Sequence, residues 1–107
     1  MSVAEKDVVD GIAIGHDGET LIMEIYDHLN FEDEFKHIAI LQDKLNTYIW
    51  FINSKQYSDL YPNTEFKSYL IIIHFLHELS DNSKKFVNES NKALVTSDIV
   101  IATCVSE

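Results

Sequence analysis

The sequence predicts an α+β domain with the element order β-β-α-β-α-β, in which a four-stranded mixed sheet carries both helices on one face. Three observations lead to this prediction. Two short β-like segments flank a turn near the N-terminus, a long segment repeats apolar residues every three or four positions, and a later apolar run does not alternate at all. At 107 residues the chain has the usual size of one domain, so we expect a single domain over residues 1–107.

The first two segments predict a β-hairpin. Residues 8–14 have a β-like composition, and residues 15–18 supply glycine and aspartate for a turn. Residues 20–26 resume the β pattern, with apolar side chains at every second position from Leu21 to Ile25. We therefore expect two adjacent antiparallel strands here.

A long helix is expected next. Asn30 is a suitable N-cap, and acidic residues follow it in the first turn, where the helix dipole favours negative charge. The apolar stripe of this helix is expected to consist of Phe35, Ile38, Leu41, Leu45, Tyr48, Ile49 and Ile52. Trp50 and Phe51 widen the stripe, which predicts burial of that end on more than one side. Lys36, Asp43, Lys44 and Asn46 are expected to lie outside it.

The apolar run over residues 68–76 predicts a central strand. Tyr69 to Ile73 are all apolar or aromatic, without the alternation of a strand that has one face in water. Such a strand needs both faces and both edges covered, because an exposed one is prone to aggregate.

The C-terminal third predicts a helix and a closing strand. Ser80 can cap a helix from Asp81 to about Leu94, whose thin apolar side places it on the surface of the sheet. Residues 99–105 are rich in β-branched residues and predict the last strand, in which Cys104 is expected to be buried.

The charge of the chain is concentrated in its first third. Residues 1–34 contain ten carboxylates and one lysine, whereas the rest contains eight carboxylates and seven lysines, so the first third carries −9 of the net −10. These residues predict an acidic surface for a basic protein partner. Its expected members are Asp17, Glu19, Glu24, Asp27, Glu32, Asp33 and Glu34. The alternative is that the same carboxylates only solvate turns and strand edges.

Composition argues against several other classes of function. The chain has no arginine and no basic stripe, which disfavours binding to nucleic acid. No segment has the roughly 20 apolar residues of a membrane span, and the charged N-terminus lacks the apolar block of a signal peptide, so we expect a cytoplasmic protein. A single cysteine excludes an intrachain disulfide and a thiolate metal cage. We expect no cofactor and no metal.

Asp27, His28 and His37 form the cluster that most resembles a site. Asp27 ends the second predicted strand, and His37 lies one or two turns into the long helix, so a carboxylate and two imidazoles can meet at this corner. Such a group can perform acid–base chemistry. The chain offers no nucleophile beside them and no glycine-rich phosphate loop, which favours a structural role in which they fix the corner by hydrogen bonding.

Part of the sequence resembles a family of small bacterial proteins catalogued only as a domain of unknown function. The most specific part is the pattern His-x3-Leu-Gln-x-Lys-Leu-Asn-x-Tyr, which runs from His37 to Tyr48. Further matching positions, between about Val3 and Phe75, are Asp10-Gly11-Ile12, Leu21 through Asp27-His28, Phe31, Phe51-Ile52 and Tyr61-Pro62. The resemblance implies a bacterial origin and this fold, and it implies no catalytic residues.

We therefore expect a non-catalytic protein-binding domain, in particular a bacterial immunity protein that binds and neutralises a cognate toxin domain. Many such toxins attack nucleic acid with basic clefts, which an acidic surface would complement. A small enzyme or ligand-binding domain using Asp27, His28 and His37 is the first alternative. The second is a homo-oligomeric structural protein, in which the last strand or an edge of the hairpin pairs with another copy.

Overall fold

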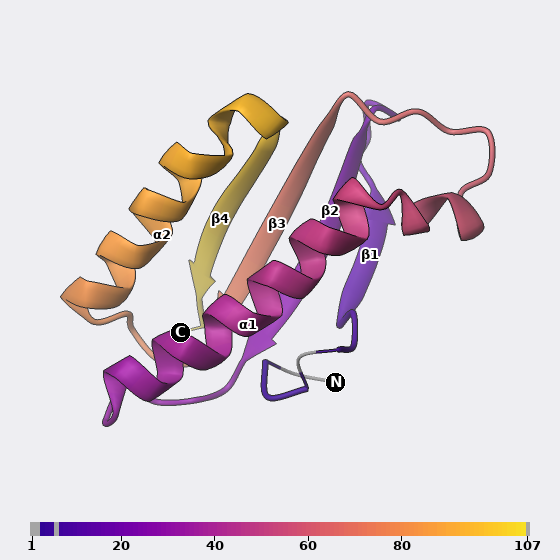
Figure 1. The fold of residues 1–107 in the computed structure, drawn as a ribbon. Helices are drawn as coiled ribbons and strands as arrows, with labels where there is room; N and C mark the ends of the chain where they lie inside the picture. Colours follow the sequence, from indigo (N-terminus) through magenta and orange to yellow (C-terminus); the bar gives the residue numbers. More distant parts are fainter. Residues whose placement is uncertain (1–2, 6, 107) are drawn as a thin grey trace.

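The computed structural model describes residues 3–5 and 7–106, and it has the predicted α+β architecture. The sheet contains four strands: β1 (Gly11–Ile14), β2 (Thr20–Asp27), β3 (Ser68–Phe75) and β4 (Ile99–Val105). Their order in space is β1-β2-β3-β4, as Figure 1 shows. The first pair is antiparallel and the other two pairs are parallel, so the mixed sheet is confirmed.

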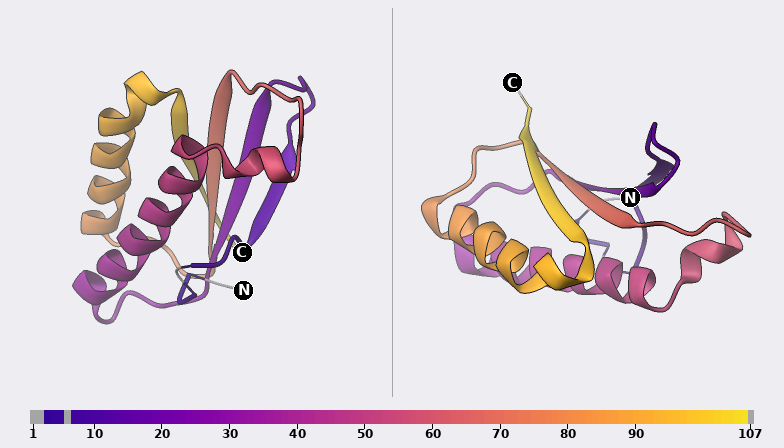
Figure 2. Two further views of the ribbon diagram at one scale, coloured as in Figure 1. Left: turned by 45° about the vertical axis from the view of Figure 1, so that its right-hand side comes forward. Right: turned by 90° about the horizontal axis from the view of Figure 1, so that it is seen from above.

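Two helices make the parallel connections. Helix α1 (Glu34–Asn53) joins β2 to β3, and α2 (Asp81–Leu94) joins β3 to β4. Two short 3-10 helices, η1 (Gln56–Asp59) and η2 (Val95–Ser97), lie between these elements. Both long helices pack on the same face of the sheet, which Figure 2 shows from above. This arrangement confirms the predicted layers.

The core lies between this face and the helices. Strand residues alternate, so Leu21, Met23 and Ile25 of β2 point toward the helices and are fully buried. The matching residues of β3 and β4 are also buried, and α1 covers them with Leu41, Leu45, Tyr48 and Ile52.

The first strand and the first helix both begin later than predicted. Strand β1 starts at Gly11 instead of residue 8, because Asp10 turns inward and its backbone N–H donates to the Tyr48 hydroxyl. Helix α1 starts at Glu34, and Asp33 is its N-cap, with a side chain that accepts a hydrogen bond from the Lys36 N–H. The predicted cap, Asn30, instead accepts from the Glu32 N–H in the preceding turn.

The apolar stripe of α1 was predicted wrongly at three positions. Phe35, at the start of the helix, is 72% exposed. Trp50 is 59% exposed, so the C-terminal end of the helix is not buried on several sides. Lys44 was expected in solvent and is fully buried. It lies three residues after Leu41 and four before Tyr48, which places it on the same face of the helix.

Strand β3 is central, as predicted, but only one of its faces is covered. Strands β2 and β4 pair with its two edges, and the helices cover Ile71 and Ile73. The opposite face of the sheet is covered by neither helix (Figure 2). We call it the open sheet face, and its outward side chains are Ile22, Glu24, Tyr26, Leu70, Ile72, His74, Val100, Ala102 and Cys104. Cys104 is therefore exposed, against the prediction.

Candidate functional site

The predicted Asp27–His37 contact exists, and it is buried. Asp27 and His37 are 2% and 3% exposed, and His37 Nε2 lies 2.5 Å from Asp27 Oδ2. His37 Nδ1 is 2.9 Å from the Asn30 carbonyl, which can only accept, so Nδ1 carries a proton. Phe31 stacks on the imidazole with 4.1 Å between ring centroids.

This geometry is suited to holding the strand-to-helix corner. Asp27 Oδ1 accepts from the Leu29 N–H at 3.0 Å, so both oxygens of the carboxylate have partners inside the protein. His37 likewise uses both ring nitrogens internally. The pair therefore joins the end of β2 to the second turn of α1.

His28 is exposed, and it takes no part in the hydrogen bonds of Asp27 and His37 described above. Two open depressions flank it, each with a volume of about 340 Å³. The first lies at the carboxyl ends of β2, β3 and β4 and is lined by Tyr26, Asp27, His28, His74, Phe75, Leu76 and Ser106. The second lies at the start of α1 and includes Asn30, Asp33 and Lys36. The carboxyl ends of parallel strands are a common place for ligands in α/β folds.

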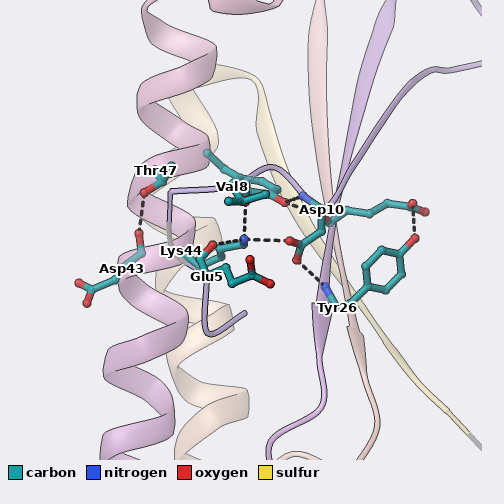
Figure 3. Close-up of polar contacts among 9 residues, drawn as sticks. Glu5, Val8, Asp10, Tyr26, Asp43, Lys44 and Thr47 are labelled. Carbon is teal, nitrogen blue, oxygen red and sulfur yellow. Dashed lines mark hydrogen bonds and ion pairs between the residues drawn. The ribbon is translucent and has the colours of Figure 1, made fainter. Parts of the chain in front are cut away.

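A second buried pair, which the sequence analysis missed, joins α1 to the N-terminal segment (Figure 3). Lys44 Nζ donates to Asp10 Oδ1 at 2.9 Å, to the Glu5 carbonyl at 2.6 Å and to the Val8 carbonyl. Each of the three ammonium protons therefore has an acceptor. Asp10 Oδ2 accepts from the Tyr26 N–H at 3.0 Å, so the pair also holds β2.

Tyr48 completes this connection. Its hydroxyl donates to the Glu24 carbonyl at 2.6 Å and accepts from the Asp10 N–H at 2.8 Å. Burial raises the pKa of Tyr48, so the phenol stays neutral in the folded protein. Lys44 and Tyr48 both belong to the helix pattern that carries the family resemblance, and their contacts give that pattern a structural role.

The seven predicted acidic residues do not form one surface. Asp17 and Glu19 lie at the β1–β2 turn, whereas Glu32, Asp33 and Glu34 lie beyond the other end of β2. The eight residues of β2 separate the two groups by roughly 23 Å. Figure 1 shows the turn and the start of α1 at opposite ends of the sheet.

The acidic residues at the two ends have local partners. Asp17 accepts hydrogen bonds from the Glu19 backbone N–H and from the Thr20 hydroxyl. These bonds, the first more than the second, lower the pKa of Asp17 from its ordinary value. Glu19 pairs with Lys67 at 3.1 Å, and Glu34 accepts from the Asn82 side chain at 2.8 Å. These carboxylates therefore stabilise the turn and the contact between the two helices, whether or not a partner binds.

Asp27 was wrongly assigned to an exposed acidic surface. Its side chain is buried against His37, because β2 alternates and residue 27 points to the helices. Glu24 has the opposite parity and belongs to the open sheet face. The predicted carboxylates other than Asp27 therefore form two groups at opposite ends of the sheet, with Glu24 between them.

Glu24 is the centre of a polar cluster on the open sheet face. The Tyr26 hydroxyl donates to Glu24 Oε2 at 2.9 Å, and His74 Nε2 lies 3.2 Å from Glu24 Oε1. The hydrogen bond to Glu24 raises the pKa of Tyr26. The Tyr26 and His74 rings stack at 5.2 Å, and the Glu24 and His74 side chains are about one-third exposed. We call these three residues the Glu24 cluster.

Apolar side chains surround the Glu24 cluster. Ile22, Leu70 and Ile72 are half-buried, and Val100 is 56% exposed. The cluster escaped the sequence analysis because it depends on the pairing of β2 with β3, which places Tyr26 beside His74. The two-residue spacing of Glu24 and Tyr26 was the only local signal, since it puts both on one face of a strand.

The described part of the chain, residues 3–5 and 7–106, lacks two further features. No helix there is long and apolar enough to cross a membrane. Among the same residues, no group of three histidine, cysteine or acidic side chains is placed to hold a metal ion.

Comparison with known proteins gives a family and no function. Residues 1–107 match the model of a family described as a family of unknown function, DUF6572, which confirms the resemblance noted in the sequence. No curated protein matches the chain. No solved structure matches it either.

Proposed function

Because the chain belongs to this family of unknown function, we propose its activity from the structure: a non-catalytic protein-binding domain, and in particular an immunity protein that neutralises a cognate bacterial toxin. The open sheet face is the observation that carries the proposal. It presents apolar side chains around a tyrosine, which is the composition of protein-binding surfaces.

The sequence of β3 also favours the view that a partner covers the open sheet face. A strand with one face in water normally alternates apolar and polar residues, and β3 does not. Leu70 and Ile72 point to the open side, where neither helix covers them as the helices cover Ile71 and Ile73 (Figure 2). A partner that covers this side would bury both residues.

The environment of Asp27 and His37, the residues considered for acid–base chemistry, favours binding over catalysis. Asp27 and His37 direct their polar atoms at each other and at the backbone of the corner. A catalytic base must reach a substrate proton, and these groups are 2% and 3% exposed.

The charge of the chain favours a basic partner. The net charge is −10, the chain has no arginine, and exposed carboxylates lie at both ends of the sheet. Toxins that cleave nucleic acid need basic clefts, so an acidic domain can approach such a cleft quickly and compete for it.

Co-expression tests the proposal. The product of the gene directly upstream is expressed in a sensitive bacterium, alone and together with this chain. We expect the upstream product to stop growth and this chain to restore it. As a matched control, a Leu41→Asp variant that cannot form the core should restore nothing. An upstream product that is harmless, or that this chain does not neutralise, contradicts the proposal.

A small-molecule site is the second candidate, since the first depression beside His28 lies at the carboxyl ends of three strands. A small-molecule site here predicts that His28→Ala removes an activity. If the chain is an immunity protein, the same variant should still restore growth.

The strand-pairing alternative meets an obstacle at β4. Asn91 of α2 accepts from the Ile101 N–H at 2.7 Å and donates to the Ile101 carbonyl at 2.9 Å. Both bonds occupy backbone groups on the outer edge of the sheet, where another strand would have to pair.

A further inference from the structure

We propose that the partner docks on the open sheet face and places a cationic side chain, best an arginine, on Glu24 beside Tyr26 and His74. This inference rests on the proposed protein-binding function and names the surface and the chemistry of the partner. It differs from the expectation drawn from the sequence, in which the acidic first third as a whole makes the contact.

The cationic requirement follows from the position of Glu24. Its carboxylate lies among apolar side chains at the centre of the face, where a docked partner would exclude water. A carboxylate buried without a compensating charge is strongly unfavourable. Tyr26 and His74 each supply one hydrogen bond, whereas a carboxylate can accept about four. A partner that brings a positively charged donor to Glu24 therefore fits this position best.

The shape beside the Glu24 cluster favours arginine. Tyr26 is 43% exposed and offers its ring to a planar cation. The depression of about 340 Å³ lined by Tyr26, His28 and His74 adjoins the cluster through two of its members, so a long side chain has room beside it. A guanidinium can bind a carboxylate with two parallel bonds and stack on an aromatic ring at the same time.

A second copy of this chain does not satisfy the requirement. None of the four strands contains a lysine, and the chain has no arginine. Two copies packed by their open faces would bring Glu24 to Glu24, each from a chain of net charge −10. The occupant is therefore a different protein with a basic side chain inside an apolar patch.

A peptide titration tests the surface without the natural partner. The probe is acetyl-Val-Arg-Val-amide, and its matched control has citrulline, which has nearly the same shape without the charge. Methyl and ring signals of the labelled protein are followed by NMR. We expect shifts at Ile72, Val100 and His74, with the arginine peptide binding about tenfold more tightly than the citrulline peptide.

Two variants decide whether Glu24 is responsible. Glu24→Gln removes the charge with little change in side-chain shape and should abolish the preference for arginine, whereas Glu32→Gln, before the start of α1, should leave it intact. The inference is overturned if the preference survives Glu24→Gln, if the signals that move are those of residues 32–34, or if the open face does not respond to either peptide.

The growth assay separates this inference from the proposed function. Val100→Lys adds a repelling charge at a side chain that is 56% exposed, so it should not disturb folding. We expect Val100→Lys and Glu24→Lys to lose neutralisation, and Glu32→Lys to retain it. If all three variants neutralise fully, the function stands and the docking surface is wrong. If the unmodified chain neutralises no toxin, the proposed function fails while the titration still judges the surface.

Discussion

Lys44 and Asp10 form an ion pair 2.9 Å long in which both side chains are fully buried. The pair connects the third turn of α1 to a segment that has no regular secondary structure. That segment precedes β1 and contacts the edge of β2 beyond the first residue of β1, since the Val3 N–H donates to the Tyr26 carbonyl at 2.9 Å. The pair acts together with the buried Val3 side chain and the Asp10–Tyr48 hydrogen bond in holding the segment there.

Breaking this pair should be costly. Lys44→Met leaves Asp10 buried without its cation, and we expect the free energy of unfolding to fall by about 3–5 kcal/mol. The exposed Lys36→Met is the matched control, with a change below about 0.5 kcal/mol. Urea denaturation measures both. Combining Lys44→Met with Asp10→Asn should cost less than the sum of the single changes, and strict additivity would argue against the pair.

The core of α1 gives a second stability test. Leu41→Ala and Leu45→Ala should each lower the free energy of unfolding by about 2–5 kcal/mol, because both side chains are buried under the sheet. Phe35→Ala removes more atoms from a site that is 72% exposed and should change stability by less than about 0.5 kcal/mol. A larger loss at Phe35 than at Leu41 would mean that α1 is rotated about its axis.

Two tyrosines predict a loss of stability at alkaline pH. Burial raises the pKa of Tyr48, and burial with the Tyr57 hydrogen bond raises the pKa of Tyr69 to about 12. In the unfolded chain both phenols ionise near pH 10. The unfolded state therefore releases protons first, and stability that is complete below about pH 10 falls as the pH rises toward the folded values.

Urea denaturation between pH 8 and 11, with tyrosinate absorbance, measures this fall. Tyr48→Phe cannot ionise at this position, so its stability should decline less steeply with pH than that of the unmodified protein. Equal slopes in the two proteins would contradict the assignment to Tyr48.

Asn91 is expected to keep the protein monomeric. Asn91→Ala frees the N–H and carbonyl of Ile101 on the outer edge of β4, which should allow strands of two copies to pair. Sedimentation over a range of concentrations should show more association than for the exposed control Asn88→Ala. The same monomeric state in both variants would show that the edge needs no protection.

Local signals predicted most of the fold. Ser80 does cap α2, and α2 and β4 have the predicted bounds, because caps and β-branched runs act over a few residues. The N-terminal segment was predicted less well. Asp10 ends the regular pairing by turning toward Lys44, a contact between residues 34 positions apart that no local pattern encodes.

The candidate site was predicted in part for the same reason. Asp27 and His37 were expected to meet, since a short connection brings the end of a strand close to the next helix. The contact between His74 and Glu24 spans 50 positions and depends on the register of two parallel strands. The apolar character of β3 was visible in the sequence, whereas the face left without cover was visible only in the structure.

The rates of complex formation with the neutralised toxin test the central claim most directly. Replacing Glu32, Asp33 and Glu34 by glutamine should slow association and flatten its dependence on ionic strength, because exposed charges at the periphery act mainly on the encounter. Glu24→Gln should instead speed dissociation, since it removes a partner from a desolvated pair. If neither variant changes either rate at any salt concentration, this chain does not bind a basic partner through the surfaces described.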